Sequence, residues 1–393
     1  MISNGLKNDP KKIVILGSTG SIGRQTLEVI AAYPDQFIVI GLAALDEAHE
    51  LVAQAQRFNC PQIALADESK YQQLKSIIPN HLVAGVGSQA ICELASLPEA
   101  DLIVSAVSGA AGIMPTIKAL EAGHQVALAN KETLVAAGDL VMQIARTEKL
   151  NIFPVDSEHS AVFQCMKGEN KAIKKIWLTA SGGPFLGRSH QELEQVTPAM
   201  ALKHPSWQMG PKITIDSATL INKGLEIIEA HHLFNLEYDF IDAIISPGSL
   251  VHALVELVDG AFLAHLGKPD MRIPIQYALT YPERWPSSAK PLNLAEAGSI
   301  CFKKPDVEAF PGFNLAITAG RQGGTMPAVM NAANEMAVAY FLAGKIGFNY
   351  IPELINEVMN RHYNTKQPNL EAILQADEWA RVTSRILVEG KIL

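Results

Sequence analysis

The sequence has 393 residues, of which 48% are hydrophobic and 18% are charged, and its formal net charge is −8. A chain of this length is expected to form two or three domains, each with its own core. The acidic balance and an aromatic content of 6% disfavour an extended nucleic-acid surface, and no apolar run approaches the roughly 18 residues that cross a bilayer. We therefore expect neither nucleic acid nor a membrane among its partners.

The chain begins with a short polar stretch that leads directly into an apolar run, without the pattern of a secretory signal. Its cysteines are scattered and form no C-x-x-C pair, which is typical of isolated thiols in a reducing compartment: Cys60, Cys92, Cys165 and Cys301. Both features predict a cytoplasmic protein.

Apolar runs alternate with helical patterns from residue 12 to about 155. This rhythm predicts a parallel sheet that is covered on both faces. The expected strands are KIVIL, FIVIGLAAL, QIALAD, HLVAG, DLIVSAV, HQVALAN and NIFPV.

The first connection, GSTGSIG (17–23), lies between a predicted strand and a predicted helix. Glycine permits close backbone approach at such a turn, and the N-terminus of the helix attracts an anion. The motif favours a dinucleotide over a nucleoside triphosphate, because Arg24-Gln25 stands where a P-loop carries Lys-Ser/Thr. A turn built only for tight strand-helix packing is the alternative.

Two further segments follow predicted strands, SAVSGAAG (105–112) and LANKETL (128–134). Ligands of parallel sheets bind at the carboxyl ends of the strands, near the point where strand order reverses. We expect the three segments to converge on one crevice.

The pattern changes beyond residue 155. KKIWLTA predicts a strand, and LVHALVELVDGAFLAHLG predicts two strands joined at Asp259-Gly260. A proline-rich linker is expected over 286–313, followed by amphipathic helices in PAVMNAANEMAVAYFLAG, IPELINEVMNRHY and LEAILQADEWARVTSRIL. The predicted domains are therefore 1–155 for the dinucleotide, 156–285 for metal and substrate, and 314–393 as a helical bundle.

Asp156 and Glu158 are two residues apart in PVDSEHSA, so in an extended segment both carboxylates point to one side. Such a pair makes half of a site for a hard divalent cation. A solvated acidic turn or a helix N-cap is the alternative interpretation.

A third oxygen ligand is available in the segment KITIDSATLINKGLEIIEAHHLF. On a helix Asn222, Lys223 and Glu226 share one face. A surface ion pair would also explain this spacing. The small polar residues nearby suit a phosphate monoester: Ser181, Gly182, Gly183, Ser217 and Thr219. The loop HPSWQMG (204–210) could form a lid over a bound ligand.

The motifs together resemble the 1-deoxy-D-xylulose 5-phosphate reductoisomerase family over nearly the whole chain. GSTGSIG, LANKETLV, PVDSEHSA, TASGGPF, HPSWQMGPKITIDSATLINKGLEIIEAHHLF, GKPDMRIPI and NAANE occur in the family's order and spacing. The resemblance implies an α/β fold with an N-terminal Rossmann-like parallel sheet, a central mixed α/β catalytic domain and a C-terminal helical bundle. It also implies a homodimer.

The same resemblance assigns roles to individual residues. The metal, Mg2+ or Mn2+, would be held by Asp156, Glu158 and Glu226, and NADPH by Thr19, Gly20, Ser21, Ile22, Asn130, Glu132 and Gly210. The substrate phosphate would meet Ser181, Ser217, Asn222 and Lys223, and the catalytic set next to the carbon chain would be Lys131, Ser157, Glu158 and His204, with Trp207 in the flap. The implied reaction rearranges a hydroxyketone phosphate, 1-deoxy-D-xylulose 5-phosphate, and reduces the product with NADPH to 2-C-methyl-D-erythritol 4-phosphate.

The chain departs from the family at two places. SPGS (246–249) replaces the usual HPQS, although His252 remains, and Ala44-Leu45-Asp46-Glu47 replaces a basic Ala-Gly-Lys/Arg-Asn pattern. An acidic residue after the second strand is typical of NAD sites, whereas the family uses NADPH. Asp46 could cap the following helix, or a basic residue from elsewhere could meet the 2′-phosphate.

Two other functions compete with this interpretation. An aldehyde dehydrogenase or acyl-phosphate reductase would need a nucleophilic cysteine, and none of the four lies in a polar loop beside a base. A non-enzymatic nicotinamide-binding redox sensor would explain the first domain but neither the acidic residues nor the phosphate-binding residues. Turnover that depends on a divalent cation would separate an enzyme from a sensor.

Overall fold

The computed structural model describes residues 9–169 and 172–392, which form two compact units. The first unit contains a seven-stranded parallel sheet in the order β4-β3-β2-β1-β5-β6-β7. Each predicted strand is present: β1 (Lys11–Leu16), β2 (Phe37–Ala44), β3 (Gln62–Leu65), β4 (Val83–Val86), β5 (Leu102–Ser105), β6 (Gln125–Leu128) and β7 (Ile152–Pro154).

Strand order reverses between β1 and β5, so the carboxyl ends of these two strands mark the switch point of the sheet. GSTGSIG follows β1 and SAVSGAAG follows β5. The helices of this unit are α1 (Ser21–Ala31), α2 (Ala48–Arg57), α3 (Tyr71–Ile77), α4 (Gly87–Ala95), α5 (Ile113–Glu121) and α12 (Arg272–Thr280), with 3-10 turns η1 (Glu68–Lys70) and η2 (Gly109–Gly112).

The second unit contains a mixed four-stranded sheet in the order β11-β10-β8-β9. β8 (Ile173–Ala180) pairs in parallel with β9 (Ile241–Ile245) and antiparallel with β10 (Val251–Leu257), which pairs antiparallel with β11 (Phe262–Leu266). The turn at Asp259-Gly260 joins β10 to β11, which confirms the predicted hairpin. Leu178, Ala253 and Val255 lie on the buried face.

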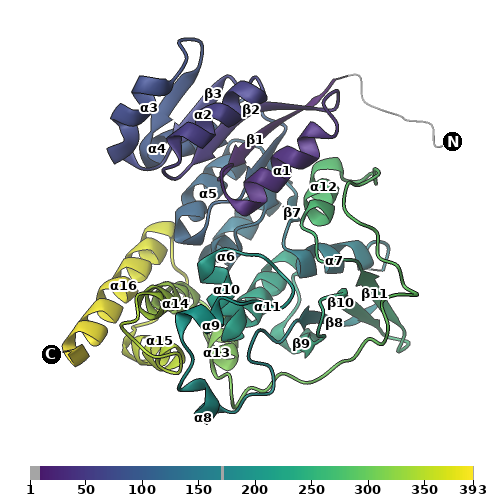
Figure 1. The fold of residues 1–393 in the computed structure, drawn as a ribbon, viewed down its shortest axis with the longest axis vertical. Coiled ribbons are helices and arrows are strands. Elements are labelled where there is room, and N and C mark those ends of the chain that lie inside the picture. Colours follow the sequence, from purple (N-terminus) through teal and green to yellow (C-terminus); the bar gives the residue numbers. More distant parts are fainter. Residues whose placement is uncertain (1–8, 170–171, 393) are drawn as a thin grey trace. The chain divides into compact units, whose positions relative to one another are not determined.

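Helix α11 (Ile221–Phe234) lies between this sheet and the C-terminal helices. A Cβ on Gly224 would lie 2.5 Å from the Ala316 side chain, so α13 (Gly312–Gln322) packs closely on α11. Figure 1 shows α14 (Met326–Leu342), α15 (Tyr350–Arg361) and α16 (Leu370–Ile392) side by side at the green-to-yellow end of the chain. The remaining helices of the unit are α7 (Ser157–Cys165), α8 (His190–Leu193), α9 (Pro198–Ala201), α10 (Pro211–Ala218) and η3 (Tyr238–Phe240).

The predicted fold class is confirmed, and the division between the units adds detail to it. Asp270–Lys290 belongs to the first unit, because the Lys11 ammonium donates to the backbone oxygen of Leu279 at 2.7 Å and Trp285 packs on Phe37. The C-terminal helices share one hydrophobic core with the second sheet. The division into three domains stays a prediction.

Helix α6 (Lys131–Thr147) contains a kink at Ala137, and its residues up to Leu140 belong to the second unit. Helix α13 is absent from the sequence-based prediction. Its apolar residues, Phe313, Ala316 and Ala319, do follow helical spacing directly after Pro311, so a signal for it existed. No helix within residues 9–169 and 172–392 has the length and hydropathy of a membrane span.

Candidate functional site

The glycine-rich connection after β1 approaches the backbone that follows β5. Gly17 has a φ of 88°, and a Cβ there would lie 2.5 Å from the backbone oxygen of Ala106. Helix α1 begins at Ser21 with Gly20 at its N-cap, and no side chain caps it. Since the first N–H groups of a helix have no intrahelical acceptor, this turn is suited to a pyrophosphate.

Asn130, the residue before α6, connects the other two segments of the predicted crevice. Its Nδ2 donates to the backbone oxygens of Val107 at 2.6 Å and Gly109 at 2.9 Å. A Cβ on Gly112 would lie 2.9 Å from the Asn130 side chain. The first two segments and Asn130 of the third therefore lie together within the first unit, while the crevice itself stays a prediction.

The connection after β2 differs from the expectation for Asp46. Helix α2 begins at Ala48, and Glu47 occupies the N-cap position without a capping hydrogen bond from its side chain. The hypothesis that Asp46 caps this helix is therefore wrong, because the helix begins one residue later than that role requires. The Glu47 carboxylate instead accepts a hydrogen bond from Thr19 Oγ1 at 2.9 Å, while Asp46 is exposed.

A buried group of carboxylates and ammonium groups occupies the start of α11 in the second unit. The Glu226 side chain is 1% exposed and accepts hydrogen bonds from Lys131 Nζ at 3.2 Å and from Lys223 Nζ and Asn222 Nδ2. The Lys223 ammonium also lies 3.4 Å from Glu158 Oε1, and Lys131 donates to Asn222 Oδ1 at 2.8 Å. The predicted shared face of α11 is confirmed, but it is an interior face rather than a surface ion pair.

Ser157 and Glu158 are the first two residues of α7, so the assumption of an extended segment through Glu158 is wrong. The start of a helix turns the chain at this point and brings Glu158 toward α11. Ser157 Oγ donates to Glu158 Oε2 at 2.7 Å, and a carboxylate oxygen of Glu158 lies within 4.8 Å of one of Glu226. Asp156 directly precedes this helix start in the chain.

The residue directly before α11 has an unusual backbone conformation. Leu220 has a φ of 59° and is 5% exposed, so a bulky side chain occupies the left-handed region in the interior. Such a conformation costs roughly 1–2 kcal/mol for a non-glycine residue, and packing must compensate for it. The sharp turn separates the face of α10 that carries Ser217 from the first turn of α11, which carries Asn222 and Lys223.

His204 connects the two predicted phosphate-binding serines. Its Nδ1 accepts hydrogen bonds from the backbone N–H groups of Ser206 at 3.2 Å and Trp207 at 2.9 Å, which assigns the proton of the neutral ring to Nε2. Nε2 then donates toward Ser181 Oγ at 3.0 Å and Ser217 Oγ at 3.1 Å. Burial lowers the pKa of His204, so the neutral ring is favoured at pH 7.

The loop that carries Ser181 approaches α10 closely. Gly183 has a φ of 68°, and a Cβ there would lie 2.8 Å from the backbone oxygen of Ser217. The Gly183 N–H donates to Ser181 Oγ at 3.1 Å. The glycine therefore allows the two serine hydroxyls to approach one histidine.

His252 is a neighbour of this region that the sequence left without a role. It lies on β10 with 5% exposure, and its ring centroid is 6.3 Å from that of Trp207. Burial, assisted by the charge of Lys223, lowers the pKa of His252 to about 4. SPGS, which precedes β10, forms a turn in which Gly248 and Ser249 have positive φ.

Glu132 and Gly210 were predicted at the cofactor site. The Glu132 carboxylate lies 2.7 Å from Lys212 Nζ, and Lys212 also lies 2.9 Å from Asp216. Asn334 of α14 donates to Asp216 at 2.8 Å. Gly210 is the N-cap of α10, so these contacts hold the first turns of α6 and α10 against α14.

Lys212 and His159 contribute to the site although sequence reasoning assigned them no role. His159 is fully buried, and its Nε2 donates to the backbone oxygen of Glu226 at 2.8 Å. Its Nδ1 lies 3.5 Å from Glu229 Oε2. A histidine in an apolar helix was the available signal, but nothing local showed which carbonyl it would meet.

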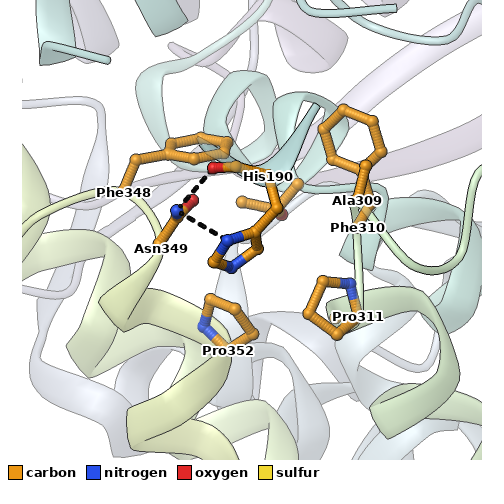
Figure 2. Close-up of a pocket in the computed structure, with 9 residues that line it drawn as sticks. His190, Ala309, Phe310, Pro311, Phe348, Asn349 and Pro352 are labelled. Carbon is orange, nitrogen blue, oxygen red and sulfur yellow. Dashed lines mark hydrogen bonds between the residues drawn. The ribbon is translucent and has the colours of Figure 1, made fainter. Parts of the chain in front are cut away.

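A small hollow in the same unit is lined by Thr219 but by none of the residues assigned to the metal, the cofactor or the catalytic set (Figure 2). Asn349 Nδ2 donates to the backbone oxygen of His190 at 2.9 Å, which connects α8 to the start of α15. The lining of the hollow includes Phe310, Pro311, Phe348 and Pro352. This wall is mainly apolar and offers no chemistry comparable to that around Glu226.

Comparisons with known proteins agree over almost the whole chain. Family models match at residues 13–138 (1-deoxy-D-xylulose 5-phosphate reductoisomerase), 152–234 (1-deoxy-D-xylulose 5-phosphate reductoisomerase C-terminal domain) and 266–383 (DXP reductoisomerase C-terminal domain). Two relatives carry the same name. The protein from Heliobacterium modesticaldum is 52% identical over 94% of this chain and 96% of its own length, and that from Pelotomaculum thermopropionicum is 54% identical over 94% and 97%.

Solved structures show the same similarity. The Zymomonas mobilis reductoisomerase in complex with NADPH has a TM-score of 0.91 and 40% identity, covering 97% of this chain and 99% of its own. A DOX-P reductoisomerase with NADPH, fosmidomycin and magnesium has a TM-score of 0.92 and 39% identity, covering 96% and 98%. With such identity over nearly its full length, the chain belongs to the 1-deoxy-D-xylulose 5-phosphate reductoisomerase family.

Proposed function

We propose that this protein rearranges 1-deoxy-D-xylulose 5-phosphate and reduces the product with NADPH to 2-C-methyl-D-erythritol 4-phosphate. The observation that carries the proposal is the group of side chains at the start of α11, where Glu158 and Glu226 meet Lys131, Lys223 and Asn222. Carboxylates suit a hard divalent cation, and buried ammonium groups suit a phosphorylated substrate.

Asp156, Glu158 and Glu226 are the proposed metal ligands. Their donor atoms are all oxygens, which favours Mg2+ or Mn2+ over zinc. The proximity of the Glu158 and Glu226 oxygens supports this set, as does the place of Asp156 directly before α7. A cation held there would polarise a carbonyl and stabilise an alkoxide as the carbon skeleton rearranges.

Ser181, Ser217, Asn222 and Lys223 are proposed to bind the substrate phosphate. Hydroxyl, amide and ammonium groups donate hydrogen bonds to phosphate oxygens, and the shared contact of the two serines with His204 supports their grouping. The proposed catalytic set is Lys131, Ser157, Glu158 and His204. These residues would orient the hydroxyl groups of the substrate, with Lys131 supplying a positive charge and His204 Nε2 a hydrogen-bond donor on a neutral ring. Trp207 would exclude water as part of a flap.

The cofactor is proposed to bind at the turn between β1 and α1. Support comes from the glycine N-cap of α1 and from Asn130, which holds the neighbouring loop. NADPH supplies the hydride when bound. The proposed contacts are Thr19, Gly20, Ser21, Ile22, Asn130, Glu132 and Gly210.

The surroundings of Cys60 and Cys92 disfavour these two thiols as nucleophiles of a cysteine-based reductase. Burial raises the pKa of the Cys60 thiol to about 12, and burial likewise raises the pKa of Cys92. Raised values oppose formation of the thiolate that such chemistry needs. A sensor without catalysis would leave the buried carboxylates of the second unit unexplained.

The function is tested with purified protein, 1-deoxy-D-xylulose 5-phosphate, NADPH and Mg2+. We expect NADPH oxidation coupled one-to-one to 2-C-methyl-D-erythritol 4-phosphate, identified by mass spectrometry, and complete loss of turnover with EDTA that excess Mg2+ restores. Substrate-dependent NADPH oxidation without this product, or turnover that survives metal removal, would refute the proposed reaction.

We further propose that the protein is a cytoplasmic homodimer in which β11 faces its counterpart. β11 is an edge strand of its sheet, and Phe262, Leu263 and Leu266 are 51%, 37% and 38% exposed. Apolar edge strands favour pairing with another chain. Light scattering should give the mass of two chains for the wild type and of one chain for Phe262→Glu/Leu266→Glu; a monomeric wild type at micromolar concentration would contradict the proposal.

A further inference from the structure

An acidic side chain, Glu47, lies beside the proposed dinucleotide loop. We propose that this site also binds NADH, with an affinity close to that for NADPH, and that Glu47 recognises the 2′-hydroxyl of the adenosine ribose. The inference rests on the proposed cofactor site and concerns which dinucleotides it accepts.

The geometry around Thr19 carries the argument. Thr19 belongs to the glycine-rich turn and is 6% exposed, and its Oγ1 donates to Glu47 Oε2 at 2.9 Å. This bond holds the Glu47 carboxylate next to the turn proposed to bind the pyrophosphate. Glu47 follows Gly23 by 24 positions, close to the roughly 20 residues after which dinucleotide folds place a carboxylate on the ribose 2′-hydroxyl.

The charges around the end of β2 disfavour a 2′-phosphate. Asp46 and Glu47 belong to this connection and Glu50 to the first turn of α2, and no lysine or arginine occurs from residue 25 to 56. The Asp67 N–H donates to the backbone oxygen of Leu45 at 2.8 Å, so a further acidic residue lies beside the same strand end. A doubly charged phosphate would meet repulsion from several carboxylates, whereas a hydroxyl would gain an acceptor.

Arg24 explains how NADPH can still bind. Its Nε donates to the backbone oxygen of Thr19 at 2.7 Å and lies 3.9 Å from Glu50, and its side chain is 55% exposed. The exposed guanidinium can meet a 2′-phosphate from the α1 side. Lys70 of η1 is the basic residue that follows β3. Such cations offset the carboxylates in part, so neither dinucleotide is excluded.

Equilibrium binding of NADPH and NADH, measured by cofactor fluorescence without substrate, tests the inference apart from catalysis. We expect the two dissociation constants to differ by less than about tenfold, since one charge-assisted hydrogen bond and the opposing repulsion are each of that order. Glu47→Gln should raise the dissociation constant of NADH by at least about threefold, because the acceptor loses its charge. The same substitution should lower the dissociation constant of NADPH.

Asp46→Asn is the matched control, because it removes one negative charge next to Glu47 without removing the bond to Thr19. This control should lower the dissociation constant of NADPH but leave that of NADH unchanged. Wild-type binding of NADPH more than tenfold tighter than NADH, or unchanged NADH binding in a folded Glu47→Gln protein, would overturn the inference. Failure of both dinucleotides to bind would instead refute the proposed function itself.

Discussion

Replacing Glu226 by Gln is expected to lower kcat by more than about a hundredfold while the dissociation constant of NADPH stays the same. A hundredfold is the usual upper effect of losing a residue that only supports a metal ligand, and a ligand itself should cost more. Glu226 is 1% exposed and balances the charges of Lys131 and Lys223. The amide would weaken the proposed metal site and remove the negative charge that Lys131 and Lys223 share, although Lys223 keeps its contact with Glu158.

Steady-state rates across a Mg2+ titration, together with NADPH fluorescence, measure both parts of this expectation. The GSTGSIG loop belongs to the first unit and Glu226 to the second, so NADPH binding reports whether the first unit of the variant keeps its fold. Glu237→Gln makes the same chemical change at an exposed residue beyond the end of α11 and should keep wild-type rates. A Glu226→Gln enzyme with more than a tenth of wild-type kcat would remove Glu226 from the ligand set.

Lys212→Met is expected to destabilise the fold by about 3 kcal/mol, because removing one partner of a buried ion pair leaves the other charge uncompensated. Burial opposes the charged form of Lys212, but Asp216 and Glu132 outweigh it and raise the pKa of Lys212. Burial likewise opposes ionisation of Glu132, but Lys212 outweighs it and lowers the pKa of Glu132. We expect a loss of unfolding free energy at the lower end of the range for buried ion pairs, because the Lys212 side chain is 29% exposed.

The effect of Lys212→Met should depend on pH with a defined sign. In the wild type the lowered pKa of Glu132 contributes stability that is present above its unfolded pKa, near 4.5, and is lost as pH falls through the lower folded value. In the variant the pKa of Glu132 is no longer lowered by Lys212, so this contribution is missing. The difference in unfolding free energy should therefore be full at pH 7 and shrink below about pH 4.5.

Urea unfolding at pH 7 and pH 4 measures this difference. Lys174→Met breaks the exposed pair with Glu256 and should unfold at the wild-type midpoint, since such surface pairs contribute little. If Lys212→Met also unfolded at the wild-type midpoint at pH 7, Lys212 would not hold α6 and α10 together.

Local sequence patterns were sufficient for the elements of the fold and for part of the site. The strands of the first sheet were predictable because parallel strands buried on both faces are continuous apolar runs. The shared face of Asn222, Lys223 and Glu226 was predictable because helical spacing alone determines it. The start of α7 was not, since Ser157 and Glu158 fit a helix N-terminus and an extended turn equally well.

The sequence by itself therefore determined the α/β class, the glycine-rich turn before α1 and the helix face that carries Glu226, because each depends on neighbours within a few residues. Only the tertiary structure decided which distant groups meet: Lys131 with Glu226, Lys212 with Glu132, and Thr19 with Glu47. The tertiary structure also decided that Glu47, rather than Asp46, contacts the glycine-rich turn. The start of α2 determines this, and it depends on how Ala48 and Leu51 pack in the core. Periodicity specifies a face of a helix, but the partner of that face is decided by packing between elements far apart in the chain.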